Sequence, residues 1–277
     1  MCVADRCAVR QENSSLDCAV HQVPLHNCCA EMLILLKRLA LLALLVLPVA
    51  AARALRIMPM GDSITQWHCD SGSQGGWRHY LFDAAQSAGA KFDTAGSQYG
   101  CGSHEGHSGW TVSDLLGIAP TTLADHTPDI LLIQAGTNDL YYKDARGANA
   151  SGTLARQDAL LNTTFSLLPN ATVLLSGVTW INATRCATYP AGPCPDDMQA
   201  NIELLNAALP GLVASYSARG FRAYAHDPNP ECQFVAEDYY TWGIHFSESG
   251  YAKIGASWWK HLQPVLAAAG QSLKPSR

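Results

Sequence analysis

The sequence has no excess of basic residues: 18 lysines and arginines stand against 23 aspartates and glutamates, for a formal net charge of −5 at pH 7. A nucleic-acid-binding surface needs clustered positive charge, so this balance argues against DNA or RNA as a partner. The sequence also has no CxxC pair, which argues against a cysteine zinc site. No internal repeat and no linker rich in glycine, serine or proline divides the chain after residue 54. The whole chain is 48% hydrophobic, and the part after residue 54 is expected to fold as one globular domain.

A long apolar run is also missing: the one within residues 32–54 is shorter than the roughly 20 residues that span a bilayer. Lys37 and Arg38 precede this run, and Pro48 interrupts it. Ala-Arg-Ala at 52–54 has the small-x-small pattern of a signal-peptidase site. Residues 32–54 are therefore predicted to be a signal peptide and the protein to be secreted, without a stable membrane span after cleavage. The alternative is a type II membrane anchor.

Met32 stands where such a signal peptide would begin. Residues 1–31 show no periodic apolar pattern, and we interpret them as an upstream extension without function. Residues 55–277 are then the working domain. Four glycosylation sequons in this domain fit a secreted glycoprotein, and they begin at Asn149, Asn162, Asn170 and Asn182.

Five cysteines lie in the predicted domain, where export to an oxidising compartment favours disulfides. Cys186 and Cys194 bracket a short loop and are the first predicted pair. Cys69 and Cys101 are the second predicted pair, which leaves Cys232 free. Spacing does not fix connectivity, so the second pairing stays open.

Short β-rich runs alternate with helical patterns after residue 54, which predicts βαβ units and a parallel sheet. Runs such as DILLIQ and TVLLSG are continuously apolar, as in strands buried on both faces. The predicted strands are 56–60, 92–95, 130–135, 173–178 and 222–225. The predicted helices are 76–88, 112–124, 152–168, 196–218 and 247–268. Right-handed crossovers then give a three-layer α/β/α sandwich around a five-stranded parallel sheet.

Two helices carry a further signal. Ser247 is predicted to be the N-cap of the last helix. Pro210 lies inside the fourth and is expected to kink or break it, because proline removes a backbone donor and clashes with the preceding turn.

Four loops carry polar residues suited to acyl transfer, where the strands of a parallel sheet would end. GDSIT contains Ser63, a candidate nucleophile, although serine is also a common helix N-cap. EGHSGW contains Gly109, whose backbone N–H could approach a ligand, and GTND contains Asn138, whose amide could donate to an oxyanion. An Asx turn is the ordinary explanation of GTND. His245, before the last helix, is a candidate general base, although a single histidine is more often structural.

In this order the blocks GDSIT, EGHSGW, GTND and GIH resemble the SGNH (GDSL-type) hydrolases. MPMGDSIT, GGWR, FDTAGSQ and EGHSGW further resemble carbohydrate esterase family 3, which includes fungal acetyl xylan esterases. The resemblance covers residues 55–262 and implies a flavodoxin-like fold. It implies Ser63 as nucleophile and His245 as general base. Its oxyanion donors would be the Ser63 and Gly109 N–H groups and the Asn138 amide. The implied chemistry runs through an acyl-enzyme and needs no cofactor or metal.

One position departs from that family. Its last block usually carries an aspartate three residues before the histidine, where this sequence has Trp242. Three arrangements remain open: Asp238 or Glu237 reaches the imidazole, a backbone carbonyl orients it in a Ser-His dyad, or the site is not catalytic. Trp242 could also stack on a sugar ring, as could Trp110.

The sequence therefore predicts a monomeric, secreted serine esterase that removes short acyl groups, acetyl above all, from oligosaccharides or polysaccharides. The alternatives are a lipase or arylesterase of the same fold and a non-catalytic carbohydrate-binding protein. Among the remaining polar residues, Asp62 and Asp139 are predicted to brace loops, and Arg78 to pair with an acidic residue that anchors the first helix.

Overall fold

The computed structural model describes residues 53–67, 76–142, 144–190 and 192–274. These belong to one compact unit, Arg53–Arg277. The predicted upstream extension, and the predicted signal peptide up to residue 52, lie outside the described residues. Within the described ranges, no helix is long and apolar enough to cross a membrane.

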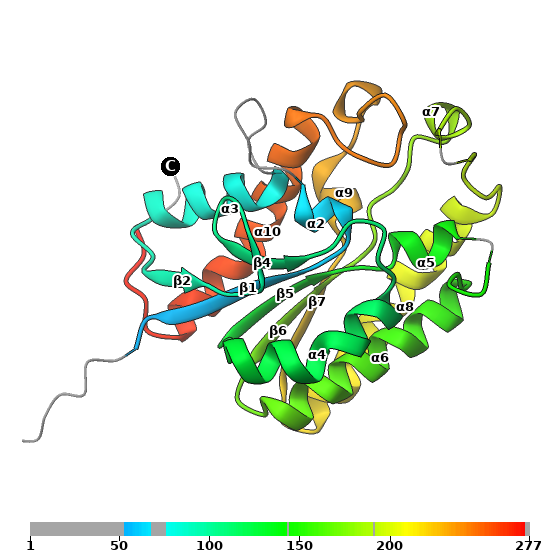
Figure 1. Cartoon of the computed structure of the whole chain (residues 1–277). Helices are drawn as coiled ribbons and strands as arrows, with labels where there is room; N and C mark the ends of the chain where they lie inside the picture. Colours follow the sequence, from blue (N-terminus) through cyan, green and yellow to red (C-terminus); the bar gives the residue numbers. More distant parts are fainter. Residues whose placement is uncertain (1–52, 68–75, 143, 191, 275–277) are drawn as a thin grey trace, which may run out of the picture. The chain divides into compact units, whose positions relative to one another are not determined.

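The centre of the unit is a mostly parallel sheet in the order β3-β4-β1-β5-β6-β7, with β2 paired to β1 (Figure 1). All five predicted strands are confirmed. Two further strands, β3 and β4, form a short antiparallel pair, and β4 runs parallel to the end of β1. The strand bounds are β1 Leu55–Gly61, β2 Phe92–Thr94, β3 Gln98–Tyr99, β4 Ser103–Gly106, β5 Ile130–Gln134, β6 Thr172–Ser176 and β7 Arg222–His226.

Helices cover both faces of the sheet, which confirms the three-layer α/β/α sandwich (Figure 1). Alternate β1 residues point to opposite faces, as in any strand. Ile57 packs in the core with α3 and α10, whereas Met58 and Met60 pack in the core with α4, α6 and α8. The five long helices lie within two residues of their predicted ends: α3 Gly76–Ser87, α4 Val112–His126, α6 Ala150–Leu167, α8 Met198–Ala218 and α10 Glu248–Ala268.

The two detailed helix predictions fare differently. Helix α8 runs unbroken from Met198 to Ala218 with Pro210 inside it, so the proline does not end the helix. Ser247 occupies the N-cap position of α10, as predicted. Its hydroxyl, however, donates to the carbonyl of Glu237 instead of accepting from an amide of the helix.

The described cysteines of the domain agree with the predicted pairing where it can be compared. Cys186 and Cys194 form a disulfide, which confirms the first pair. Cys232 is free and buried, as predicted. Cys101 is not free, and Cys69, its predicted partner, lies outside the described residues, so the second pair stays a prediction.

Candidate active site

The loops that carry the candidate residues leave the same edge of the sheet. Gly61 at the end of β1 pairs with Gly106 at the end of β4 and with Gln134 at the end of β5. The strands are parallel, so the segments that follow them emerge side by side. The segments that contain Ser63, Gly109 and Asn138 therefore begin next to one another.

Ser63 begins the short helix α2 (Ser63–Gln66), directly after β1. Asp62 caps this helix: its Oδ1 accepts a hydrogen bond from the Ile64 N–H at 2.9 Å. Gly106 lets β4 approach α2 closely, because a Cβ at this position would lie 2.5 Å from the Gln66 nitrogen. The nucleophile candidate is thus held on a turn packed between the ends of two strands.

His245 reaches Ser63 from the other end of the chain. The Oγ of Ser63 lies 2.8 Å from Nε2 of His245, across 182 residues of sequence. The histidine lies in a tight turn, where the Tyr240 N–H donates to the His245 carbonyl at 2.8 Å. Gly243 adopts φ +72° in this turn, a conformation that favours glycine. The structure therefore brings the predicted nucleophile and base together.

Burial lowers the pKa of His245 to about 4. The imidazole is therefore neutral at neutral pH, and its Nε2 can accept the proton of the Ser63 hydroxyl. A hydroxyl needs such a base to become a nucleophile. The pair has the geometry and the protonation state for general-base catalysis.

Asp238 is not the acid that orients His245. Its carboxylate accepts from the Val235 N–H at 2.9 Å, the Ser249 hydroxyl at 2.8 Å and the Lys253 ammonium at 2.5 Å. Nδ1 of His245 has no hydrogen-bond partner among the described residues. The contacts of Asp238 fix the start of α10, which is a structural task. Neither a carboxylate nor a backbone carbonyl reaches Nδ1 among the described residues, so the contacts show a Ser63–His245 pair without a third member.

The Asp238→Asn variant is therefore expected to keep its esterase activity but lose stability, by roughly 1–3 kcal/mol, because its buried hydrogen bonds weaken. Steady-state kinetics on 4-nitrophenyl acetate and thermal unfolding measure the two effects. Asp144→Asn, at an exposed ion pair with Arg146, is the matched control. Removing a true triad acid costs about 10⁴-fold. A loss of that size in a folded Asp238→Asn protein would restore Asp238 as the orienting acid.

Gly109 and Asn138 lie on segments that are bonded to each other. The Asn138 side-chain amide donates to the Trp110 carbonyl at 2.9 Å, from the short helix α5 (Thr137–Tyr141). The Tyr142 hydroxyl donates to the Gly109 carbonyl at 2.9 Å. On the other side, the Ser108 N–H donates to the Gln66 side chain of α2 at 2.6 Å. The loop with Gly109 is thus held between the Ser63 helix and the Asn138 helix.

Two aspartates brace loops, as the sequence predicts. Asp62 caps α2, and Asp139 accepts from the Val112 N–H at 2.9 Å and from Arg156 at 2.6 Å. Burial raises the pKa of Asp62 to about 6. Neither carboxylate is placed as one half of an acid–base pair.

Among the described residues Arg78 has no acidic partner, which contradicts the prediction. Its fully buried guanidinium donates to backbone carbonyls: those of Thr65 at 2.7 Å and Gln66 at 2.9 Å in α2, and that of Gly100 at 2.5 Å. Burial lowers its pKa to about 10, which leaves it charged at neutral pH. Five donors in a rigid fork suit this task. Arg78 thereby fixes the end of the helix that begins with Ser63.

An aromatic cluster, made of Tyr189, Tyr240 and Trp242, lies close to the histidine. The Trp242 ring is 6.0 Å from Tyr240 and 5.9 Å from Tyr189. Tyr240 lies 6.0 Å from Trp67, whose ring is 5.3 Å from the His245 ring. The Trp242 side is open to solvent, with 37% of the residue exposed. The cluster thus offers an exposed aromatic surface connected to the site.

A serine hydroxyl bonded to the imidazole of a histidine, at the carboxyl edge of a parallel sheet, is an arrangement suited to hydrolysis through a serine nucleophile. The GDSL-like lipase/acylhydrolase family matches residues 60–253, and the chain belongs to that family.

Solved structures and curated proteins agree with this family. The family 3 carbohydrate esterase of Clostridium thermocellum is 28% identical, with a TM-score of 0.60 over 78% of this chain and 99% of that one. A family 3 carbohydrate esterase from Talaromyces cellulolyticus shares the fold, at 23% identity and a TM-score of 0.62 over 77% of this chain and 99% of that one.

Among curated proteins, a multidomain esterase of Ruminococcus flavefaciens is 26% identical over 250 residues, 79% of this chain. A putative endoglucanase X of Acetivibrio thermocellus is 28% identical over 155 residues, 56% of this chain. The matched regions span 30% and 58% of the lengths of these two relatives.

Proposed function

We propose that this protein hydrolyses short acyl esters, acetyl above all, on carbohydrates. The observation that carries the proposal is the 2.8 Å contact between the Ser63 hydroxyl and Nε2 of His245. The substrate class is supported by the similarity to the family 3 carbohydrate esterase of Clostridium thermocellum, whose whole length the chain nearly covers. The exposed aromatic cluster near His245 supports a sugar as the alcohol half of the ester.

The proposed reaction uses five groups of the chain. Oγ of Ser63 attacks the ester carbonyl while Nε2 of His245 takes its proton. The developing oxyanion accepts hydrogen bonds from the Ser63 and Gly109 N–H groups and from the Asn138 amide. The carbon–oxygen bond to the sugar then breaks, and His245 returns the proton to the leaving hydroxyl. Water, deprotonated by His245, attacks the acyl-enzyme and releases the carboxylic acid and free Ser63.

Asn138→Ala is expected to lower kcat by about 10²- to 10³-fold, because it removes one oxyanion donor. Single-turnover and steady-state rates on 4-nitrophenyl acetate measure this loss. Gln86→Ala, at an exposed amide side chain of α3, is the control and is expected to keep the native rate. Because Asn138 also bonds the Trp110 carbonyl, thermal unfolding of both variants must accompany the kinetics. A folded Asn138→Ala protein with less than a tenfold loss would move the donor role to another group.

Trp242→Ala is expected to raise KM for acetylated xylan by roughly 3- to 10-fold, the value of one lost stacking contact. The rate on 4-nitrophenyl acetate, which has no sugar, is expected to stay native. Trp180→Ala is the matched control, because Trp180 is equally exposed, at 38%, and lies outside the cluster. Equal losses on both substrates would contradict a sugar-binding role of the cluster.

A non-catalytic carbohydrate-binding protein is the second candidate, favoured by the absence of a partner for Nδ1 of His245 among the described residues. Purified protein that binds xylan but hydrolyses neither acetylated xylan nor 4-nitrophenyl acetate would establish it. A preference for long-chain esters would instead favour a lipase of the same fold.

We further propose that the protein is secreted. The predicted signal peptide, the Cys186–Cys194 disulfide and the four sequons support export. N-terminal sequencing of the exported protein is expected to start close to Leu55. A sequence that begins within residues 1–31 would contradict both the cleavage and the assignment of the upstream extension.

A further inference from the structure

Three potential metal ligands meet beside the sheet, away from Ser63. His226 ends β7, Glu231 lies in the short helix α9 (Pro228–Cys232) and His261 lies on α10. One ligand atom of each lies within 4.8 Å of the other two. Strand β7 is three strands away from β1, or about 14 Å along the sheet. The cluster is thus separate from the strand that carries the nucleophile.

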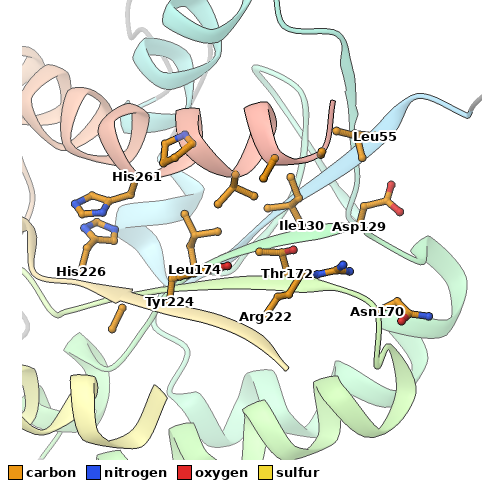
Figure 2. Close-up of a pocket in the computed structure, with 15 residues that line it drawn as sticks. Leu55, Asp129, Ile130, Asn170, Thr172, Leu174, Arg222, Tyr224, His226 and His261 are labelled. Atoms are coloured by element: carbon orange, nitrogen blue, oxygen red, sulfur yellow. The ribbon is translucent and has the colours of Figure 1, made fainter. Parts of the chain in front are cut away.

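The two histidines share one end of a cavity of about 500 Å³ (Figure 2). Their rings lie nearly parallel, with centroids 4.5 Å apart and planes at 20°. Nε2 of His261 lies 3.0 Å from Oε1 of Glu231. Figure 2 shows His261 approaching from the helix and His226 from the strand, so that the side chains of two elements converge.

His226 is the unusual member of the cluster. The residue is 7% exposed, and neither ring nitrogen has a hydrogen-bond partner among the described residues. Buried polar atoms nearly always have a partner, so two orphaned nitrogens on one buried ring call for a ligand. Trp258 packs its ring at 73° and 4.4 Å against His226 and fixes its orientation.

Glu231 supplies the negative charge. Its carboxylate is bonded by the Lys260 ammonium, the Ser257 hydroxyl and the His261 ring. The Ser257 hydroxyl donates to Oε2 at 2.7 Å and orients the carboxylate, as the outer partners of metal ligands do. The Lys260 ammonium lies 2.8 Å from Oε1, but its side chain is 68% exposed and can turn to solvent when a cation binds.

We propose that His226, Glu231 and His261 bind a divalent transition-metal ion, with Zn²⁺ as the best fit. Two imidazoles and one carboxylate are a common zinc ligand set, and bonds of about 2.0–2.2 Å require the ligand atoms to close up by about an ångström. The cavity leaves room for water as the fourth ligand. The ion would join β7, α9 and α10 and stabilise the helix that follows the His245 turn. It takes no part in the proposed reaction at Ser63.

Metal content tests this site directly. The native protein is dialysed against EDTA and then against ZnCl₂, and bound zinc is measured by mass spectrometry. One zinc per chain is expected for the native protein, with a rise in the unfolding temperature that EDTA reverses. His261→Ala and Glu231→Gln are expected to bind zinc at least about tenfold more weakly and to lose that rise. Co²⁺ in place of zinc is expected to give the visible absorption of a tetrahedral site in the native protein and to lose it in His261→Ala and Glu231→Gln.

His79→Ala is the matched control. The His79 side chain is 31% exposed and that of His261 is 32%, and each lies near a carboxylate, yet His79 is outside the cluster. Zinc binding by this control is expected to equal that of the native protein. The proposal is overturned if the native protein takes up no zinc, or if the control loses as much zinc as His261→Ala. Both His261 and Glu231 are partly exposed, so their variants avoid the folding defect expected at buried His226.

Discussion

Replacing Ser63 by alanine is expected to lower the rate of ester hydrolysis by roughly 10⁴- to 10⁶-fold. Ser63→Ala removes Oγ, the atom that attacks the ester in the proposed reaction. This is also the atom that lies 2.8 Å from Nε2 of His245. The binding surface and the remaining oxyanion donors stay in place, which leaves a small residual rate. The measurement is kcat/KM on 4-nitrophenyl acetate and on acetylated xylan, for the secreted native and variant proteins.

Ser215→Ala is the control for this prediction. Ser215 is exposed on α8, where its hydroxyl donates to the Leu212 carbonyl, and its loss is expected to leave the rate native. Circular dichroism must show that both variants are folded. A folded Ser63→Ala protein with more than a tenth of the native rate would contradict the nucleophile. A folded native protein without any rate would favour the carbohydrate-binding alternative.

The second large effect is the dependence of the rate on His245 and on pH. A general base works only in its neutral form, and burial lowers the pKa of His245 to about 4. The value of kcat/KM is therefore expected to stay level from neutral pH down to about pH 5 and to fall as the pH drops through about 4. At pH 5 about nine tenths of the imidazole is neutral, against about 3% for a histidine with the ordinary pKa of 6.5, a difference of about 30-fold.

His245→Ala is expected to lose about 10⁴-fold or more in kcat/KM at neutral pH, because no other base reaches Ser63 among the described residues. His79→Ala, at a partly exposed histidine of α3, is the control and is expected to keep the native profile. An acid limb near pH 6.5 would show that the imidazolium is stabilised in the working enzyme, as by a carboxylate on Nδ1. That result would contradict a Ser-His pair without an orienting acid, but it would leave the assignment of Ser63 as nucleophile unchanged.

Much of the fold could be predicted because its signals are local. The runs that form β5 and β6 are largely apolar, ILLIQ and TVLLS, and every residue of both strands is buried. Strands β3 and β4 were missed, since they have only two and four residues and their sequences, QY and SHEG, are largely polar. β4 forms because the end of β1 offers it an edge and Glu105 is satisfied by hydrogen bonds from Ser97 and Thr122. Such tertiary compensation leaves no pattern in the sequence.

Some residues of the candidate site could also be predicted from local sequence, and others could not. Ser63 and His245 could be predicted because each stands in a recognisable block at the end of a predicted element. Asp238 failed as an orienting acid, since nearness in sequence to His245 says nothing about which way its carboxylate points. Arg78 failed because an arginine is expected to pair with an acid, whereas this one satisfies carbonyls of the α2 turn. The only signal available in the sequence was the position of Arg78 directly after Trp77 in the first predicted helix.

The cluster of His226, Glu231 and His261 could not be predicted from the sequence either. The two histidines are 35 positions apart on a strand and a helix, too far for a local ligand spacing to show in the sequence. Only the packing of α10 over β7 brings their rings together. The signal in the sequence was a histidine that ends an apolar strand, five residues before a glutamate.

Covalent trapping of the nucleophile tests the central claim most directly. The secreted native protein is treated with a fluorophosphonate, which reacts with an activated serine hydroxyl, and the modified peptide is identified by mass spectrometry. We expect one label per chain, on Ser63, with labelling slowed strongly in His245→Ala and unchanged in Asp238→Asn. A label on any other residue, or equal labelling of the native and His245→Ala proteins, would contradict the central claim.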